Sequence, residues 1–141
     1  MTPSKIEKKD GKEKLIFPRF HQLNAVRKIL SDARSNGTGQ NYLIQHSAGS
    51  GKSNTIAWTA HQIINLHDLE DESLFDTAII VTDRRVLDRQ LQDTISGFEQ
   101  TKGVVQKIDG TSRDLKSAIE DGKRIIITTI QKFGTEHLAT L

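Results

Sequence analysis

The residues best suited to chemistry in this sequence are Lys52 and Ser53, which directly follow two closely spaced glycines, Gly49 and Gly51. Glycines allow a backbone turn whose successive N–H groups point at an anion, and the start of a following helix adds further N–H donors. Lys52 would bring a positive charge next to the β- and γ-phosphates of a nucleotide, and the Ser53 hydroxyl would bind Mg²⁺. The spacing therefore predicts a phosphate-binding loop, or P-loop, for ATP and Mg²⁺.

The elements expected around this loop agree with that interpretation. The apolar run at residues 42–44 predicts a buried strand before the loop, and apolar residues at helical spacing predict a helix after it, to about Leu66. The apolar positions of that helix are Ile56, Ala60, Ile63 and Ile64. The general motif begins with glycine, whereas this sequence has His46 there, with the Gly-x-Gly-Lys-Ser core intact.

The predicted nucleotide-binding residues are His46, Ser47, Ala48, Gly49, Ser50, Gly51, Lys52 and Ser53. Lys52 is the predicted catalytic charge, and Ser53 is the predicted magnesium ligand. A glycine- and serine-rich turn before an ordinary helix is the alternative interpretation. It would explain the glycines but not the Lys-Ser pair between a strand and a helix.

A glutamine upstream of the loop is a candidate for adenine recognition. Gln22 follows an aromatic-Pro-Arg-aromatic segment at residues 17–20. A glutamine amide can pair with both N6 and N7 of adenine, so the residue type suits that role. A glutamine on a helix surface is the alternative, because a helix with an apolar face is predicted from here to a loop at residues 35–39. The apolar face consists of Leu23, Val26, Ile29, Leu30 and Ala33.

The rest of the chain predicts the fold class. Apolar segments at residues 78–81, 103–108 and 125–129 predict three further strands, with helical segments between them. Strands alternating with helices are typical of a parallel sheet covered by helices on both faces. We therefore expect an α/β fold with the three layers of a P-loop NTPase. Ligands bind beyond the carboxyl ends of such strands, where the P-loop and residues 82–85 and 128–132 all lie.

Composition excludes several other classes. The chain has 141 residues, enough for one domain with a modest core, and it has no cysteine, which excludes disulfides and thiolate metal sites. No apolar run is long enough to cross a membrane, and a cytoplasmic protein is expected. The net charge of +2 does not by itself indicate nucleic-acid binding. Residues 1–14 are polar and predict a flexible lead-in, with a basic DNA-binding arm as the alternative.

Four segments taken together, residues 17–22, 45–53, 81–90 and 128–133, resemble consecutive motifs of the motor subunit of type I restriction-modification enzymes. The resemblance extends over residues 15–133 and includes a histidine at the position of His46. It implies a partial first RecA-like domain of superfamily 2 helicases at residues 15–141. The family's Asp-Glu-Ala-His box, second motor domain and nuclease domain are not found among these motifs.

The resemblance also implies contacts with the DNA backbone, which would position the protein without reading sequence. The residues that match the family's DNA-contacting motifs are Thr82, Arg84, Arg85, Thr128, Thr129 and Gln131. A solvated loop is the alternative for the two arginines. Strand propensity is the alternative for the two threonines of residues 128–129.

The function implied by the resemblance is that of an ATP-dependent translocase of double-stranded DNA, in complex with modification and specificity subunits. The chain alone is expected to bind nucleotide without hydrolysing it at a useful rate. Two other functions stay open. A small P-loop kinase acting on a metabolite would need an arginine-rich lid, which the sequence after residue 110 does not contain. A non-catalytic remnant would only bind DNA or partner subunits.

Overall fold

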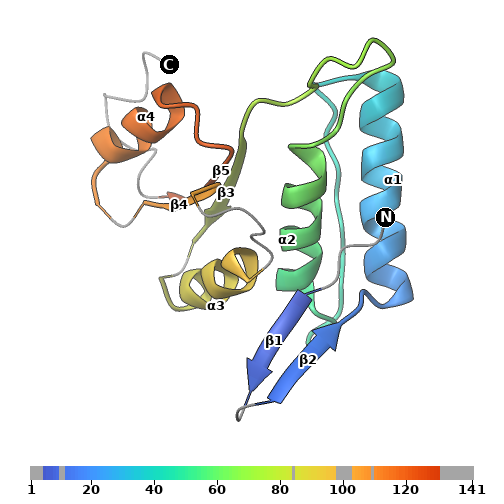
Figure 1. Cartoon of the computed structure of the whole chain (residues 1–141), viewed down its shortest axis with the longest axis vertical. Helices are drawn as coiled ribbons and strands as arrows, with labels where there is room; N and C mark the ends of the chain where they lie inside the picture. The colour runs from blue at the N-terminus through green and yellow to red at the C-terminus, as the bar shows by residue number, and fades with distance from the viewer. Residues whose placement is uncertain (1–4, 10–11, 84, 98–102, 109, 131–141) are drawn as a thin grey trace.

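The computed structural model describes residues 5–9, 12–83, 85–97, 103–108 and 110–130 (Figure 1). In chain order the elements are β1 (Lys5–Lys9), β2 (Lys12–Ile16), α1 (Phe20–Asn36), α2 (Lys52–Ile63), β3 (Ala78–Thr82), α3 (Arg85–Ser96), β4 (Val105–Lys107), α4 (Ser112–Glu120) and β5 (Ile125–Thr129). This alternation confirms the predicted α/β class. None of the helices in the described part of the chain is long and apolar enough to cross a membrane.

A three-stranded parallel sheet lies at the centre of the fold, with the strand order β3-β5-β4. All five residues of the central strand β5 are buried. Because side chains alternate along a strand, Ile125 and Ile127 face one core cluster, with residues of α1, α2 and α3, whereas Ile126 faces a second cluster with α4. Helices therefore cover both faces of the sheet, and the predicted three-layer arrangement is confirmed.

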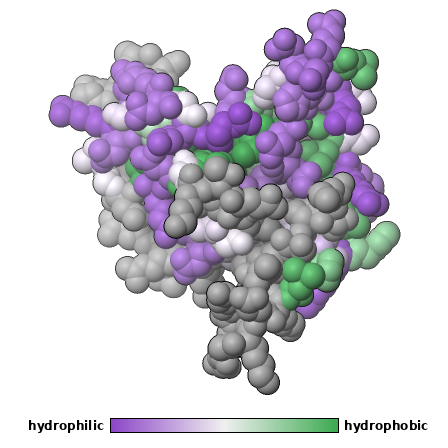
Figure 2. All heavy atoms as spheres, viewed as in Figure 1, coloured by the Kyte–Doolittle hydropathy of each residue, from purple (hydrophilic) through white to green (hydrophobic). Residues whose placement is uncertain are grey.

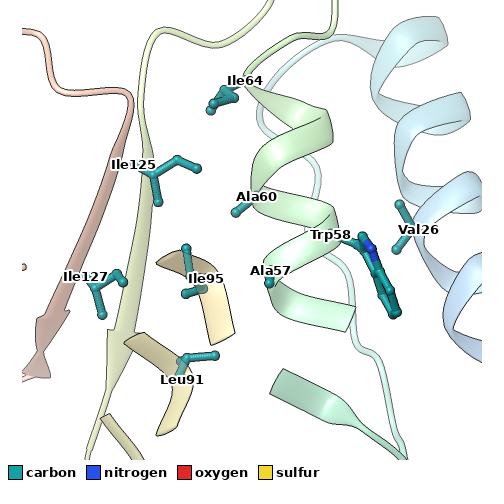
Figure 3. Packing of buried hydrophobic residues seen from close by; sticks show 9 residues of the cluster. All are labelled: Val26, Ala57, Trp58, Ala60, Ile64, Leu91, Ile95, Ile125 and Ile127. Atoms are coloured by element: carbon teal, nitrogen blue, oxygen red, sulfur yellow. The ribbon is translucent and has the colours of Figure 1, made fainter. Parts of the chain in front are cut away.

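The larger core cluster fixes helix α2, at whose N-terminus the P-loop ends (Figure 3). Trp58 of α2 is 1% exposed and points toward Val26 of α1, while another face of α2 packs against α3 and β5. At the other end of α2, the Arg124 guanidinium donates a hydrogen bond to the carbonyl of Ile64. A cation at a helix C-terminus also interacts favourably with the helix dipole. The helix that follows the P-loop is thus fixed along its length.

Residues 5–9 and 12–16 form the two strands of a hairpin, in the part of the chain where the sequence predicted a flexible lead-in at residues 1–14. Strand β1 pairs antiparallel with β2, from Lys5 opposite Ile16 to Lys9 opposite Lys12, and Figure 1 shows the hairpin projecting below α1 and α2. Lysine and glutamate are weak strand formers, so propensity gave no signal for it. Ile16 packs against the larger core cluster and anchors the hairpin there, since an isolated two-stranded hairpin is marginally stable at best.

The strand expected at residues 42–44 is not formed, and that prediction is wrong. Residues 41–47 contain no strand, and Leu43 is 96% exposed. Within the described residues β3 pairs only with β5, so its other edge is open and is not paired with this segment. A cleft of about 400 Å³ is lined by Ile44 on one side and by β3 residues, including Ile79, on the other. Ile56, expected in the core, also lines this cleft and is 40% exposed.

One face of the molecule has a concave region. Figure 2 shows a notch between two hydrophilic parts of the surface, with hydrophobic side chains at its base. Hydrophobic side chains outside the core are also present on the edge strand β3, where Ile79 is 39% and Val81 is 44% exposed. An edge strand with exposed apolar residues can pair with further strands.

Residues 41–47 lie beside helix α1 instead of the sheet. The Tyr42 hydroxyl donates a hydrogen bond of 2.6 Å to the Asp32 carboxylate of α1, which also accepts one of 2.7 Å from the Asn36 amide. The segment and α1 together line a groove of about 910 Å³. The hydrogen bond to Asp32, aided by partial desolvation and the Asp32 charge, raises the pKa of Tyr42 above its usual 10.0.

Titration of Tyr42 tests this arrangement. Tyr42 is the only tyrosine, so tyrosinate absorbance reports on it alone, and its midpoint is expected above pH 10.0. Because the folded-state pKa is raised, the bond stabilises the fold below about pH 10 and this stabilisation is lost as the pH rises through the raised pKa. Asp32→Ala should return the midpoint to about 10, and Glu70→Ala, in an exposed loop, should not. An unshifted wild-type midpoint would contradict the contact.

Candidate nucleotide-binding site

The predicted P-loop turns from its position beside α1 into the N-terminus of α2. Gly49 and Gly51 have φ values of 72° and 85°, in the left-handed region that glycine adopts readily. The Ser50 N–H donates to the Ser47 carbonyl at 3.3 Å, which closes a turn, and the Thr55 N–H donates to the Gly51 carbonyl at 3.1 Å, which begins the helix. The two glycines thus have the backbone conformation that the predicted loop requires.

The loop has the features of an anion cradle. A Cβ added at Gly49 would meet nothing within 4 Å, so the space beside this turn is open. Within the described helix α2, no side chain caps the N-terminus and no acidic residue lies in the first turn. The N–H groups there remain available, and the helix dipole favours an anion. Ser50 Oγ and His46 Nε2 are buried without a hydrogen-bond partner, as are Arg124 Nε and Thr128 Oγ1 elsewhere in the described residues; at the loop, a bound ligand would offer such partners.

Lys52 and Ser53 open helix α2 directly after this turn. Lys52 is exposed and lines the cleft between α2 and β3, while Ser53 is half-buried. A positive charge at the end of the loop and a hydroxyl one residue later are the groups that hold phosphates and Mg²⁺ in a P-loop. The residues present therefore fit a magnesium nucleotide.

Gln22, the predicted adenine-binding residue, lies against the P-loop. Its side chain amide donates to the Gly51 carbonyl at 2.9 Å and accepts from the Arg19 N–H at 2.8 Å, and the residue is 3% exposed. A Cβ on Gly51 would overlap Gln22 Nε2, so glycine is required here by close approach as well as by its φ value. The structure brings Gln22 and the loop together, with both polar groups of the amide bonded within the protein.

Sequence reasoning missed His21. Its Nε2 lies 2.9 Å from the Ser50 carbonyl oxygen of the P-loop. Its ring meets the ring of His46 edge to face, with a centroid distance of 5.1 Å and an interplanar angle of 82°. The signal in the sequence was its position next to Gln22 at the start of the same helix. The first turn of α1 therefore contacts the loop through two neighbouring side chains.

Of the residues predicted to contact DNA, three lie at the carboxyl ends of β3 and β5, which pair so that Thr82 is opposite Thr129 and Val81 is opposite Thr128. Thr82 is half-buried, whereas Thr128 and Thr129 are 0% and 8% exposed. The two threonines of β5 are therefore covered in this structure, in keeping with the strand-propensity alternative. Arg85 is the first residue of α3. Outside the described residues lie Arg84 and Gln131.

Comparison with known proteins agrees with these features. The sequence profile of a family described as SWI2/SNF2 ATPase matches residues 21–140. The chain is 32% identical over 129 residues to the type I restriction enzyme SauMSSORF170P endonuclease subunit of Staphylococcus aureus, a match that covers 88% of this chain and 13% of the relative. It is 31% identical over 120 residues to the SsaAORF53P endonuclease subunit of Staphylococcus saprophyticus, covering 85% of this chain and 12% of the relative.

The chain thus spans about 13% of the length of the curated relatives that it matches. The resemblance to type I restriction endonuclease subunits is confirmed by these identities. The profile match includes the P-loop, strands β3 to β5 and helices α1 to α4. It begins one residue after the start of α1. On this evidence the chain belongs to the SWI2/SNF2 ATPase family.

Proposed function

We propose that this chain is the nucleotide-binding part of an ATP-dependent translocase of double-stranded DNA that serves a type I restriction endonuclease. The observation that supports this most strongly is the P-loop itself, in which two left-handed glycines lead into a helix that opens with Lys52 and Ser53. The family of the chain and the names of its relatives support the choice of ATP over other phosphate ligands. A cytoplasmic location goes with this proposal.

In this proposal the protein binds, orients and screens the phosphates. The N–H groups of the loop and of the first turn of α2 would donate to phosphate oxygens, Lys52 would neutralise charge on the β- and γ-phosphates, and the Ser53 hydroxyl would bind Mg²⁺. Bound ATP would supply the phosphoanhydride whose hydrolysis drives movement along DNA. Adenine recognition by Gln22 would require its amide to exchange a bond within the protein for one to the base.

DNA contact is the second part of the proposal. We assign it to residues that end or follow β3 and β5 in the sequence, namely Thr82, Arg84, Arg85 and Gln131. Thr128 and Thr129, being buried, would support this edge of the sheet from within. Contacts of this kind to phosphates are independent of sequence and weaken with salt. Duplex DNA and the modification and specificity subunits of a restriction complex are the proposed partners.

Removal of the Lys52 charge tests the proposal. Lys52→Ala is expected to weaken the binding of a fluorescent ADP with Mg²⁺ by roughly 10- to 100-fold, because a charge-assisted hydrogen bond contributes about 1.5–3 kcal/mol. The control is Lys116→Ala, which removes the same charge from the surface of α4, where Lys116 Nζ lies 3.8 Å from Glu120. Nucleotide affinity that is unchanged by Lys52→Ala, or absent from folded wild-type protein, would contradict the proposal.

A further inference from the structure

Two neighbouring residues of α1 hold two neighbouring carbonyls of the P-loop. His21 Nε2 lies 2.9 Å from the Ser50 oxygen, and Gln22 Nε2 donates to the Gly51 oxygen, also at 2.9 Å. A carbonyl oxygen can only accept a hydrogen bond, so His21 Nε2 must bear the proton and act as the donor. The two bonds link the first turn of α1 to peptide groups 29 residues away in the chain.

These bonds determine where the loop's N–H groups point. All peptide bonds of the described chain are trans. In a planar trans peptide the C=O and the N–H of the following residue point in opposite directions. When the Ser50 oxygen is directed at His21, the N–H of the same peptide group, that of Gly51, points away from α1. In the same way, the bond from Gln22 to the Gly51 oxygen directs the Lys52 N–H away from α1.

The His21 ring is itself held in place at the other end of the loop. His46, the first residue of the loop motif, contacts the His21 ring edge to face at a centroid distance of 5.1 Å. His21 therefore contacts the loop at His46, before the turn, and at Ser50, after it. Through these two contacts the His21 side chain restrains the distance between His46 and Ser50, as well as the direction of the Ser50 carbonyl.

We propose that His21 is a positioning residue of the nucleotide site, which orients the Gly51 N–H toward a bound phosphate by donating from Nε2 to the Ser50 carbonyl. This inference rests on the proposed nucleotide-binding function. His21 does not touch the nucleotide. It acts through the peptide group between Ser50 and Gly51, in the same way that Gln22 acts on the next peptide.

His21→Phe separates the hydrogen bond from the ring contact, because phenylalanine keeps an aromatic ring against His46 and has no N–H donor. The affinity for fluorescent ADP with Mg²⁺ is expected to fall by about 3- to 10-fold, as for loss of one neutral hydrogen bond. His21→Gln should rescue the affinity to within about 2-fold of wild type, because the glutamine Nε2 lies at a similar reach along the side chain and bears an N–H.

His61 offers a matched control. His61 lies in the last turn of α2, at the opposite end of the helix from the loop. Its Nε2 lies 3.0 Å from the Ile95 carbonyl of α3, so His61→Phe removes the same kind of bond there. This variant should lose stability without a change in nucleotide affinity. Amide NMR spectra without nucleotide add a second readout: His21→Phe should move the Gly51 amide signal, and His61→Phe should not.

The outcomes distinguish the two proposals. If wild-type protein binds nucleotide and His21→Phe binds it equally tightly, the positioning role is wrong and the nucleotide site stands. If wild-type protein binds no nucleotide, the proposed function fails, and an unmoved Gly51 signal in His21→Phe overturns the positioning role independently. His21→Asn, whose shorter amide cannot reach Ser50 as glutamine can, replaces the Phe variant if that variant does not fold.

Discussion

Gly51→Ala is expected to lower the free energy of unfolding by about 3 kcal/mol, a large fraction of the 5–15 kcal/mol that a domain of this kind has. About 1–2 kcal/mol arises because alanine is strained at a φ of 85°. The remainder arises because the new Cβ would overlap Gln22 Nε2 and displace that buried amide from the Gly51 carbonyl. Urea denaturation followed by the fluorescence of Trp58, the only tryptophan, measures the loss.

The control for backbone strain alone is Gly122→Ala. Gly122 follows α4 with a φ of 69°, and an added Cβ there meets nothing within 4 Å. Its loss should be only about 1–2 kcal/mol. Adding Gln22→Ala to Gly51→Ala should relieve the overlap, so the double variant should lose less than the sum of the two single variants. Equal losses for the two glycine variants would contradict the close packing of Gln22 on the loop.

Trp58→Ala is expected to lower the free energy of unfolding by about 3–5 kcal/mol, because it leaves a large cavity between α1 and α2. Trp58 is 1% exposed and belongs to the cluster that also contains Val26 and Ile127 (Figure 3). Far-ultraviolet circular dichroism measures unfolding in this variant, since its fluorescent probe is removed. Under conditions in which this variant is partly unfolded, the amount of bound nucleotide should fall in proportion to the fraction of folded protein.

Leu69→Ala serves as the comparison for an exposed apolar residue. Leu69 is 98% exposed in the loop between α2 and β3, so its truncation should change stability by no more than about 0.5 kcal/mol. A loss below about 1 kcal/mol for Trp58→Ala, or equal losses for both variants, would contradict the packing of α2 on α1.

The sheet and the helices after residue 77 could be predicted because their patterns are local. The run Ile125–Ile126–Ile127 is apolar without interruption, and the structure buries it on both faces as the central strand. Leu115 and Ala118 lie at helical spacing within one of the predicted helical segments, and α4 covers Ile126 with that face. Such patterns specify an element and its buried side, whatever the element contacts.

Features that depend on distant partners could not be predicted. The apolar run at residues 42–44 indicates a segment suited to burial, but it does not specify a neighbouring strand, and in this structure Tyr42 bonds to Asp32 instead. A single glutamine also gives no periodic signal. Gln22 could be expected near the nucleotide only by its chemistry and by resemblance, and its bond to Gly51 joins residues 29 positions apart. His21 gave no signal beyond its place beside Gln22.

Nucleotide binding at the loop is tested most directly by an amide NMR titration of the wild-type chain with ADP and Mg²⁺. If the loop is a nucleotide-binding P-loop, the largest saturable shifts should be those of the amides of residues 49–53, whose N–H groups would donate to the phosphates. Lys52→Ala should reduce these shifts at equal nucleotide concentration. Shifts that are absent, or that centre on another part of the chain while residues 49–53 stay unchanged, would contradict the account.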